Sequence, residues 1–399
     1  MSVNRRIALF FAVTVLFNLA ANFAHPVTPT FFQQLGLADY LFGYALATML
    51  TLNFLLSPFW GKLNSLISSR TSMLIACLGY ALGQVFFALA TSESEVLIAR
   101  AFAGVFTGGT FVTMLNYIIN TAPDGRTRGV WLTICSTIGS VAGAFGYFIG
   151  GMLGVIDIRL AFGAQVVCLC LSGFLYYIVC IPDTRSGLDK PNPAKLIKEA
   201  NPFAAFSEST KFMSLTVAVL LAVVALHSLG TVGFDQSFNY YLKDQFNFSS
   251  AYNGTLKAIM GLVTLIANST VCLWLIRNTD VKRSIIALLL LCTLTALLIV
   301  NMGSVMPFLV LNVCFYAIGA ICMPLFQSIV AGVTKAGDSN LVMGLYNSIK
   351  SLGSIIGAAA SGSLYVLNPK FPFHFAMIAL AFATLGALFF RKRSILDTD

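Results

Sequence analysis

Twelve apolar stretches, each long enough to cross a bilayer as a helix, follow one another along almost the whole chain. A membrane-spanning helix needs about 20 predominantly apolar residues. Only 10% of this chain is charged, against about 25% of an average soluble domain. The sequence therefore predicts an all-α polytopic membrane protein and excludes a soluble enzyme, a fibrous protein and a disordered chain. The stretches are Ile7–Phe31, Tyr40–Trp60, Ser72–Ala90, Val96–Ile119, Val130–Gly154, Leu160–Ile181, Phe212–Tyr241, Ala251–Leu275, Ser284–Met302, Met306–Ala331, Leu341–Val366 and Phe373–Phe390.

The connection between the sixth and seventh stretches is long and polar, whereas most of the others are short. It covers residues 182–211 and carries three prolines among lysines and glutamates. We therefore predict an N-terminal six-helix bundle over residues 1–181, a cytoplasmic linker over 182–211 and a C-terminal six-helix bundle over 212–399.

Lysines and arginines gather on one side of the predicted membrane. With the amino terminus inside, eighteen of the 24 lie in cytoplasmic loops and tails, three lie outside and three lie within spans. This asymmetry predicts that both termini are cytoplasmic. Because the net charge of +9 is scattered between apolar segments, we predict no nucleic-acid partner.

The two halves of the chain resemble each other weakly. An offset of 214 residues aligns Gly139 with Gly353 and Gly143 with Gly357, in the fifth and eleventh stretches. Parallel half-repeats are typical of transporters that rock two bundles about a central site. Glycines four residues apart also allow two helices to pack closely, which is the alternative interpretation of the same pattern.

The fourth stretch carries a local motif, LIARAFAGVFTGG from Leu97, with Arg100 four residues before Gly104. On this motif the chain resembles the major facilitator superfamily, and within it the twelve-span drug:proton antiporters. The resemblance implies a monomeric transporter of two pseudo-symmetric six-helix bundles, in which this arginine is linked to proton coupling.

Two further motifs of that family are present in altered form. The fifth stretch resembles the antiporter signature, but Tyr147 stands where the family has proline. The loop after the second stretch, GKLNSLISSR from Gly61, has Ser65 in place of the family's aspartate. The residues to which the resemblance assigns a conformational role are Gly61, Arg70, Gly104, Gly146, Gly150 and Gly151.

Four strongly charged residues lie well inside the spans: Arg100, Asp235, Lys257 and Lys350. Such residues are costly in a membrane and usually face the protein interior or a water-filled cavity. The segment VGFDQSFNYYL around Asp235 resembles the acidic stretch of NorA-like multidrug pumps, although the second carboxylate of those pumps, before Pro324, is absent here. We assign proton coupling to Asp235, with Arg100 and Lys350. The alternatives are a structural ion pair of Asp235 with Lys257 or Lys350, and a role for Lys350 in anchoring an anionic substrate.

Polar side chains recur at helical spacing on the first, seventh and tenth spans. In the resembled family these helices line the central cavity, so we expect the polar stripes to meet there. The alternative is ordinary interhelical hydrogen bonding, worth about 0.6 kcal/mol per contact. The candidate substrate-binding residues are Asn18, Asn22, His25, His227, Gln236, Asn239, Tyr316, Met323, Gln327, Asn347 and Lys350.

Several chemistries lack their sequence patterns. There is no Walker A sequence, no hydrolase motif and no ligand-like spacing of cysteine and histidine. We therefore predict no enzymatic activity, cofactor, metal or disulfide.

Taken with the resemblance, the sequence favours proton-coupled efflux of small amphipathic or drug-like compounds, by alternating access in a bacterial cytoplasmic membrane. The expected partners are a small-molecule substrate, protons and the lipid bilayer. Two alternatives stay open: a carrier of one anionic metabolite or lipid, by uptake or as a flippase, and a sensor or membrane enzyme on a transporter scaffold.

Overall fold

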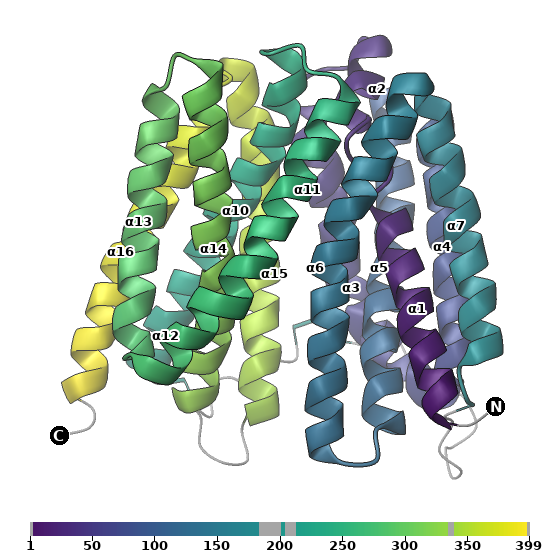
Figure 1. Cartoon of the computed structure of the whole chain (residues 1–399), viewed down its shortest axis with the longest axis horizontal. Coiled ribbons are helices and arrows are strands. Elements are labelled where there is room, and N and C mark those ends of the chain that lie inside the picture. The colour runs from purple at the N-terminus through teal and green to yellow at the C-terminus, as the bar shows by residue number, and fades with distance from the viewer. Residues whose placement is uncertain (1–2, 183–200, 204–212, 334–338, 397–399) are drawn as a thin grey trace. The chain divides into compact units, whose positions relative to one another are not determined.

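The computed structural model describes residues 3–182, 201–203, 213–333 and 339–396, and its regular elements there are all helices (Figure 1). Three elements are short: α2 (Thr28–Gln34), the π-helix η1 (Asn268–Cys272) and α12 (Leu273–Asn278). The long helices are α1 (Val3–Ala21), α3 (Leu41–Leu66), α4 (Ser69–Leu89), α5 (Glu93–Thr121), α6 (Gly125–Ile156), α7 (Ile158–Val179), α10 (Leu215–Asp244), α11 (Ser250–Ala267), α13 (Val281–Asn301), α14 (Val305–Val333), α15 (Ser339–Leu367) and α16 (Phe371–Leu396).

Ten spans among the described residues are long and apolar enough to cross a membrane, judged by length and composition. The two other long helices, α1 and α15, have 19 and 29 residues. The predicted all-α, multi-pass membrane fold is therefore confirmed, and the twelve long helices correspond to the twelve predicted spans.

The first predicted span is wrong as one continuous helix over Ile7–Phe31. Helix α1 ends at Ala21, a turn follows, and α2 begins at Thr28. The reason is Pro26, which has no backbone N–H to donate and whose ring disfavours helix in the residue before it. Pro29 then stands in the first turn of α2, where its fixed φ suits a helix start.

Several polar residues outside the predicted spans cap the helices. Ser92 and Glu95 form a reciprocal capping box at the start of α5. Asp124, Asp157 and Asp280 accept backbone N–H bonds at the starts of α6, α7 and α13. Side-chain caps satisfy N–H groups that have no partner inside the helix, so part of the acidic residues outside the spans has a structural role.

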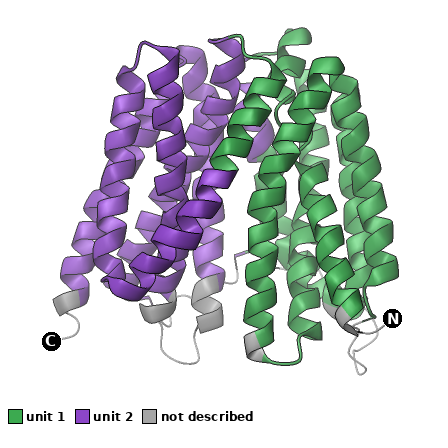
Figure 2. Cartoon of the chain, viewed as in Figure 1, with its two compact units in different colours: residues 1–38, 48–202, 247–261 green, residues 39–47, 203–246, 262–399 purple. Residues whose placement is uncertain are grey.

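The described residues fall into two compact units, coloured separately in Figure 2. Unit 1 contains residues 1–38, 48–202 and 247–261, and within it α1 packs on α6 and α7, and α4 on α5 and α7. Unit 2 contains residues 39–47, 203–246 and 262–399, and within it α10 packs on α15 and α16, and α13 on α14 and α16. Most of the predicted linker (183–200 and 204–211) lies outside the described residues, and the division at the linker stays a prediction.

Glycines allow close helix packing in both units. In unit 1, a Cβ atom built on Gly146 or Gly150 of α6 would overlap the carbonyl oxygen of Leu19 or Phe23. In unit 2, Gly353 and Gly357 of α15 meet the carbonyl oxygens of Ala225 and Leu229 on α10 in the same way. In both units, therefore, helices approach each other so closely that only glycine fits at these positions. The tight pair in α6 is not the pair that the offset of 214 aligns with α15.

Candidate functional site

The carboxylate of Asp235 lies on α10 in unit 2 and accepts a hydrogen bond from the hydroxyl of Tyr316 on α14. Both side chains are half-buried. The Tyr316 ring lies 6.4 Å from the Phe234 ring and 5.9 Å from the Phe238 ring, measured between centroids. Asp235 is thus held by a polar hydroxyl inside an aromatic surrounding, where a carboxylate is much less well solvated than in water.

His227 lies two turns earlier on α10, about 12 Å from Asp235 along the helix axis at 1.5 Å per residue. Its side chain is 2% exposed, and its ring lies 5.2 Å from that of Phe326. Neither ring nitrogen has a hydrogen-bond partner in the described part of the chain. The half-buried Lys350 of α15 lies within electrostatic range of this imidazole. The structure therefore brings His227 and Lys350 into one neighbourhood.

The remaining predicted residues of unit 2 have unequal surroundings. Asn239 is 7% exposed, Gln236 is half-buried, and the side chains of Gln327 and Asn347 are exposed. The sulfur of Met323 lies 4.0 Å from the Tyr346 hydroxyl. The candidate residues on α10 are therefore buried or half-buried, whereas Gln327 on α14 and Asn347 on α15 are exposed.

Arg100 is a buried charge of unit 1, with its side chain 6% exposed on α5. The guanidinium carbon lies 3.7 Å above the ring of Phe87, and Nη1 lies 3.9 Å from the sulfur of Met49. Nε has no hydrogen-bond partner among the described residues. A desolvated cation held by a ring and a thioether is costly, on the order of several kcal/mol, unless an anion joins it.

Asn18 and Asn22 bond to the backbone of their own segment. The side-chain amide of Asn18 donates to the Thr14 carbonyl, and that of Asn22 donates to the Asn18 carbonyl, each at 2.8 Å. Asn22 and His25 lie beyond the end of α1. The prediction that these three polar residues share one face of a single helix is therefore wrong, because the chain turns before Pro26.

Tyr147, which stands at the position of the family's proline, is the centre of a basic neighbourhood in unit 1. The His25 ring stacks on it at 5.3 Å with an interplanar angle of 10°, and Lys257 Nζ lies 5.7 Å from its centroid. Lys257 is 8% exposed. Sequence reasoning missed this cluster because its members lie on three separate segments, and the only signal was the tyrosine itself.

The other motif residues serve mainly to pack helices. A Cβ atom on Gly104 would overlap the Met49 carbonyl, whereas one on Gly61 would only touch Val112 at 4.0 Å. The Arg70 guanidinium lies 5.0 Å above the Tyr177 ring. Gly151 approaches Ser250 of α11, whose hydroxyl donates to the Gly151 carbonyl at 3.0 Å.

Comparison with known proteins decides the family. The sequence model of the Major Facilitator Superfamily matches residues 10–300 and again residues 220–397. The chain belongs to the major facilitator superfamily. This membership makes it a multi-pass membrane transporter that binds small-molecule substrates, and transporters of this superfamily are generally not enzymes.

Three relatives within the superfamily differ in what their names say they carry. Human major facilitator superfamily domain-containing protein 10 is 24% identical over 79% of this chain and 71% of its own length. Its crystal structure, that of the human organic anion transporter MFSD10 (TETRAN), superposes with a TM-score of 0.67 at 19% identity over 97% of this chain and 100% of that chain. Multidrug resistance protein 1 of Bacillus subtilis is 21% identical over 94% of both chains. Quinolone resistance protein NorA of Staphylococcus aureus is 24% identical over 62% of this chain and 61% of its own.

The major facilitator fold and the resemblance to NorA-like pumps are thus confirmed. The names of the relatives divide between drugs and organic anions, so the family alone does not choose the substrate.

Proposed function

We propose that this transporter exports small amphipathic compounds in exchange for protons, with Asp235 as the proton-carrying group. The observation that carries the proposal is the hydrogen bond from Tyr316 to Asp235. A hydroxyl donor stabilises the charged carboxylate, and an apolar surrounding stabilises the protonated form. Inside a span, a carboxylate with such a donor is the side chain to which we assign the proton during transport.

The aromatic surroundings of this pair support an amphipathic substrate. The rings of Phe234 and Phe315 stack at 4.1 Å between centroids, and Phe238 adds a further face beside Tyr316. These three phenylalanine rings are themselves buried, so the half-buried ring of Tyr316 is the one that offers a face to apolar or cationic groups. The multidrug and quinolone resistance proteins among the relatives also support export of such compounds.

The proposal includes the cellular location of the transporter and its conformational mechanism. The chain acts as a monomer in a bacterial cytoplasmic membrane with both termini in the cytoplasm, as the charge asymmetry predicts. The two predicted six-helix bundles rock about the substrate site to give alternating access.

The test is flux of a cationic dye, ethidium, in proteoliposomes under an imposed pH gradient. Asp235→Asn is expected to abolish gradient-driven flux, and Tyr316→Phe to slow it. Asp244→Asn is the matched control, since Asp244 lies on the same helix and also accepts a tyrosine hydroxyl, that of Tyr365 at 2.8 Å; it is expected to keep the flux. Gradient-driven flux that survives Asp235→Asn, or its absence in the wild type, refutes the proposal.

A second candidate function is transport of organic anions, and the buried guanidinium of Arg100 favours it. An anionic substrate would supply the counter-charge that Arg100 lacks among the described residues, and human domain-containing protein 10 is an organic anion transporter. The test is flux of the anionic dye carboxyfluorescein in the same liposomes. Arg159→Gln is the control, since Arg159 is an exposed arginine of α7. Flux that is lost in Arg100→Gln and kept in Arg159→Gln would select this function instead.

A further inference from the structure

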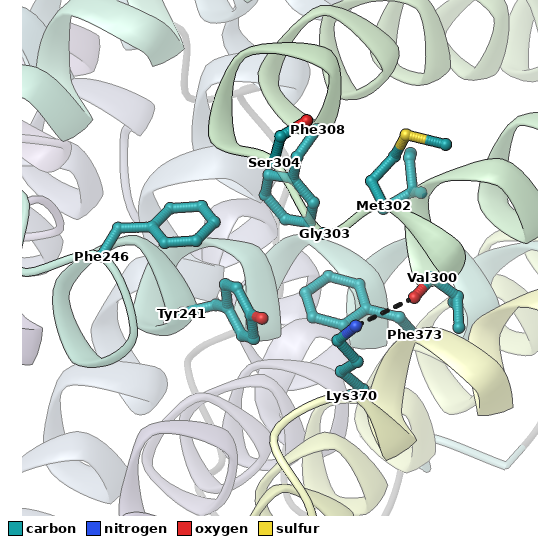
Figure 3. A pocket seen from close by; sticks show the side chains of 10 residues that line it. Tyr241, Phe246, Val300, Met302, Gly303, Ser304, Phe308, Lys370 and Phe373 are labelled. Atoms are coloured by element: carbon teal, nitrogen blue, oxygen red, sulfur yellow. Dashed lines mark hydrogen bonds between the residues drawn. The ribbon is translucent and has the colours of Figure 1, made fainter.

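A pocket opens at one end of unit 2, beyond the aromatic rings that surround Asp235, and two of its lining residues, Phe373 and Phe308, contact the rings of Phe234 and Phe238. It lies where α10 ends and where α14 and α16 begin (Figure 3). This is the end opposite the C-terminus in unit 2 (Figure 1), which the charge asymmetry predicts to be external. Its walls are mainly aromatic: Tyr241, Phe246, Phe308 and Phe373 line it, with Lys370 and Ser304 as polar members.

The four rings form a connected set that leaves a defined space. Tyr241 and Phe308 stack at 5.5 Å, and Phe246 meets Tyr241 and Phe308 edge-on at 5.3 Å each. Phe373 meets the Tyr241 ring at 5.4 Å and nearly at right angles. Edges and faces are therefore both presented to the pocket, as aromatic groups prefer in their contacts with one another.

The size of the pocket suits one small ring. Its volume is about 170 Å³, whereas a dry cavity of about 150 Å³ in another protein holds one benzene molecule. A monocyclic ligand fits, and a drug-sized molecule does not.

The polar groups of the pocket select the charge of its ligand. Figure 3 shows the Lys370 ammonium beside the carbonyl oxygen of Val300, with a distance of 3.3 Å between Nζ and that oxygen. One backbone bond leaves the ammonium with two further N–H donors. The Tyr241 hydroxyl also lines the pocket and has no hydrogen-bond partner in the described ranges. The Lys370 ammonium and the Tyr241 hydroxyl can therefore each donate a hydrogen bond to a ligand, and the positive charge of Lys370 favours an anion over a cation.

The carboxylate of Asp244 lies within electrostatic range of the Tyr241 hydroxyl, but other donors engage it. Asp244, one turn after Tyr241 on α10, is not among the lining residues. It accepts hydrogen bonds from the Tyr365 hydroxyl at 2.8 Å and the Gln245 amide at 2.6 Å. Lys370 is therefore the charged group that a ligand in the pocket meets.

We propose that this pocket is a binding site for small aromatic monoanions of the benzoate type, separate from the Asp235 site. The ring lies among Tyr241, Phe246, Phe308 and Phe373, and the carboxylate receives hydrogen bonds from Lys370 and Tyr241. Tyr241 and Asp235 are six residues apart on α10, about 9 Å at 1.5 Å per residue. The site goes beyond the proposed function, since binding here needs no proton gradient and no transport.

The test is equilibrium binding of radiolabelled benzoate to the full chain in phosphatidylcholine nanodiscs, without a gradient. Lys370→Gln is expected to weaken binding at least tenfold, and Tyr241→Phe about threefold. Lys243→Gln is the matched control, because it removes the same charge from the last turn of α10 but does not line the pocket; binding is expected to stay within twofold. Acetate, which has no ring, and benzylamine, which has the opposite charge, are expected not to compete.

The proposal is overturned by the absence of saturable benzoate binding, by equal weakening in Lys243→Gln and Lys370→Gln, or by equal competition from benzylamine. Because Lys370 also bonds the end of α13, the thermal stability of each variant is measured alongside. If Lys370→Gln does not fold, benzoate binding is compared in Tyr241→Phe and Lys370→Arg instead. Lys370→Arg keeps the positive charge and is expected to keep binding, whereas Tyr241→Phe is expected to weaken it. Nanodiscs that contain phosphatidylglycerol test whether the natural ligand is an anionic lipid headgroup instead of a free anion. Loss of benzoate binding in these nanodiscs would assign the pocket to an anionic lipid and overturn the proposal.

Discussion

Replacing Gly150 by alanine tests whether the close approach of α6 to the chain after α1 stabilises unit 1. The new methyl carbon would lie 2.6 Å from the Cα atom of Phe23, whereas ordinary van der Waals contact begins near 3.4 Å. Because the methyl carbon would lie still closer to the carbonyl oxygen of Phe23, the two segments must separate by more than 1 Å, or the backbone must distort. Overpacking of this kind costs about 1–3 kcal/mol.

The matched control is Gly163→Ala in α7, where a methyl group would meet no protein atom within 4 Å. Alanine is preferred over glycine inside a helix by about 1 kcal/mol, and both variants share this gain. The difference between them therefore isolates the steric term. We expect Gly150→Ala to unfold at a lower temperature than Gly163→Ala, by about 2–4 °C per kcal/mol for a unit of this size, in a thermal unfolding assay of the purified protein in detergent. Equal midpoints for the two variants would refute the steric reasoning.

Three further predictions concern other contacts. Ser92→Ala removes the cap of α5 and is expected to lower thermal stability by about 1 kcal/mol without changing transport. The control, Ser94→Ala, changes an exposed serine outside the cap and should cost less. Equal losses of stability would contradict a capping role for Ser92. Tyr240→Phe removes the hydroxyl that donates to Asp39 at 2.5 Å. The control, Tyr44→Phe, removes only a neutral hydrogen bond to Ser363 at 2.9 Å. We expect amide hydrogen exchange over residues 41–47 to be faster in Tyr240→Phe than in Tyr44→Phe, and the reverse order would count against the Asp39 contact. His227→Leu is expected to raise thermal stability by about 1–3 kcal/mol, because it removes buried ring nitrogens without described partners, and a fall in stability would mean that the imidazole is bonded.

The fold was largely predictable from local sequence. The apolar stretches lie within a few residues of the observed helices, because a bilayer requires every spanning segment to satisfy its own backbone hydrogen bonds. The first stretch is the exception, since hydropathy does not register the break that Pro26 imposes. The predicted stretch Ala251–Leu275 likewise contains a π-helical turn from Asn268 to Cys272 that apolar composition does not reveal.

The candidate site was predictable in its members and less so in their partners. Asp235 and Arg100 could be selected because ionisable residues inside a span are costly and rare. Their contacts could not: Asp235 meets a tyrosine 81 residues away, and Arg100 a phenylalanine ring and a thioether. Helical spacing places residues on one face of a helix, but it does not say which neighbour that face meets.

The sequence by itself determined the number and approximate position of the long helices, the family and the residues that carry intramembrane charge. These properties are local, since the thickness of the bilayer and the cost of burying charge act on each segment separately. The tertiary structure alone decided that Tyr147 gathers His25 and Lys257, that Tyr240 reaches Asp39 across 201 residues, and that four aromatic rings and Lys370 enclose a pocket. Such contacts depend on the rotation of each helix about its axis, and that rotation is set by the packing of several helices at once.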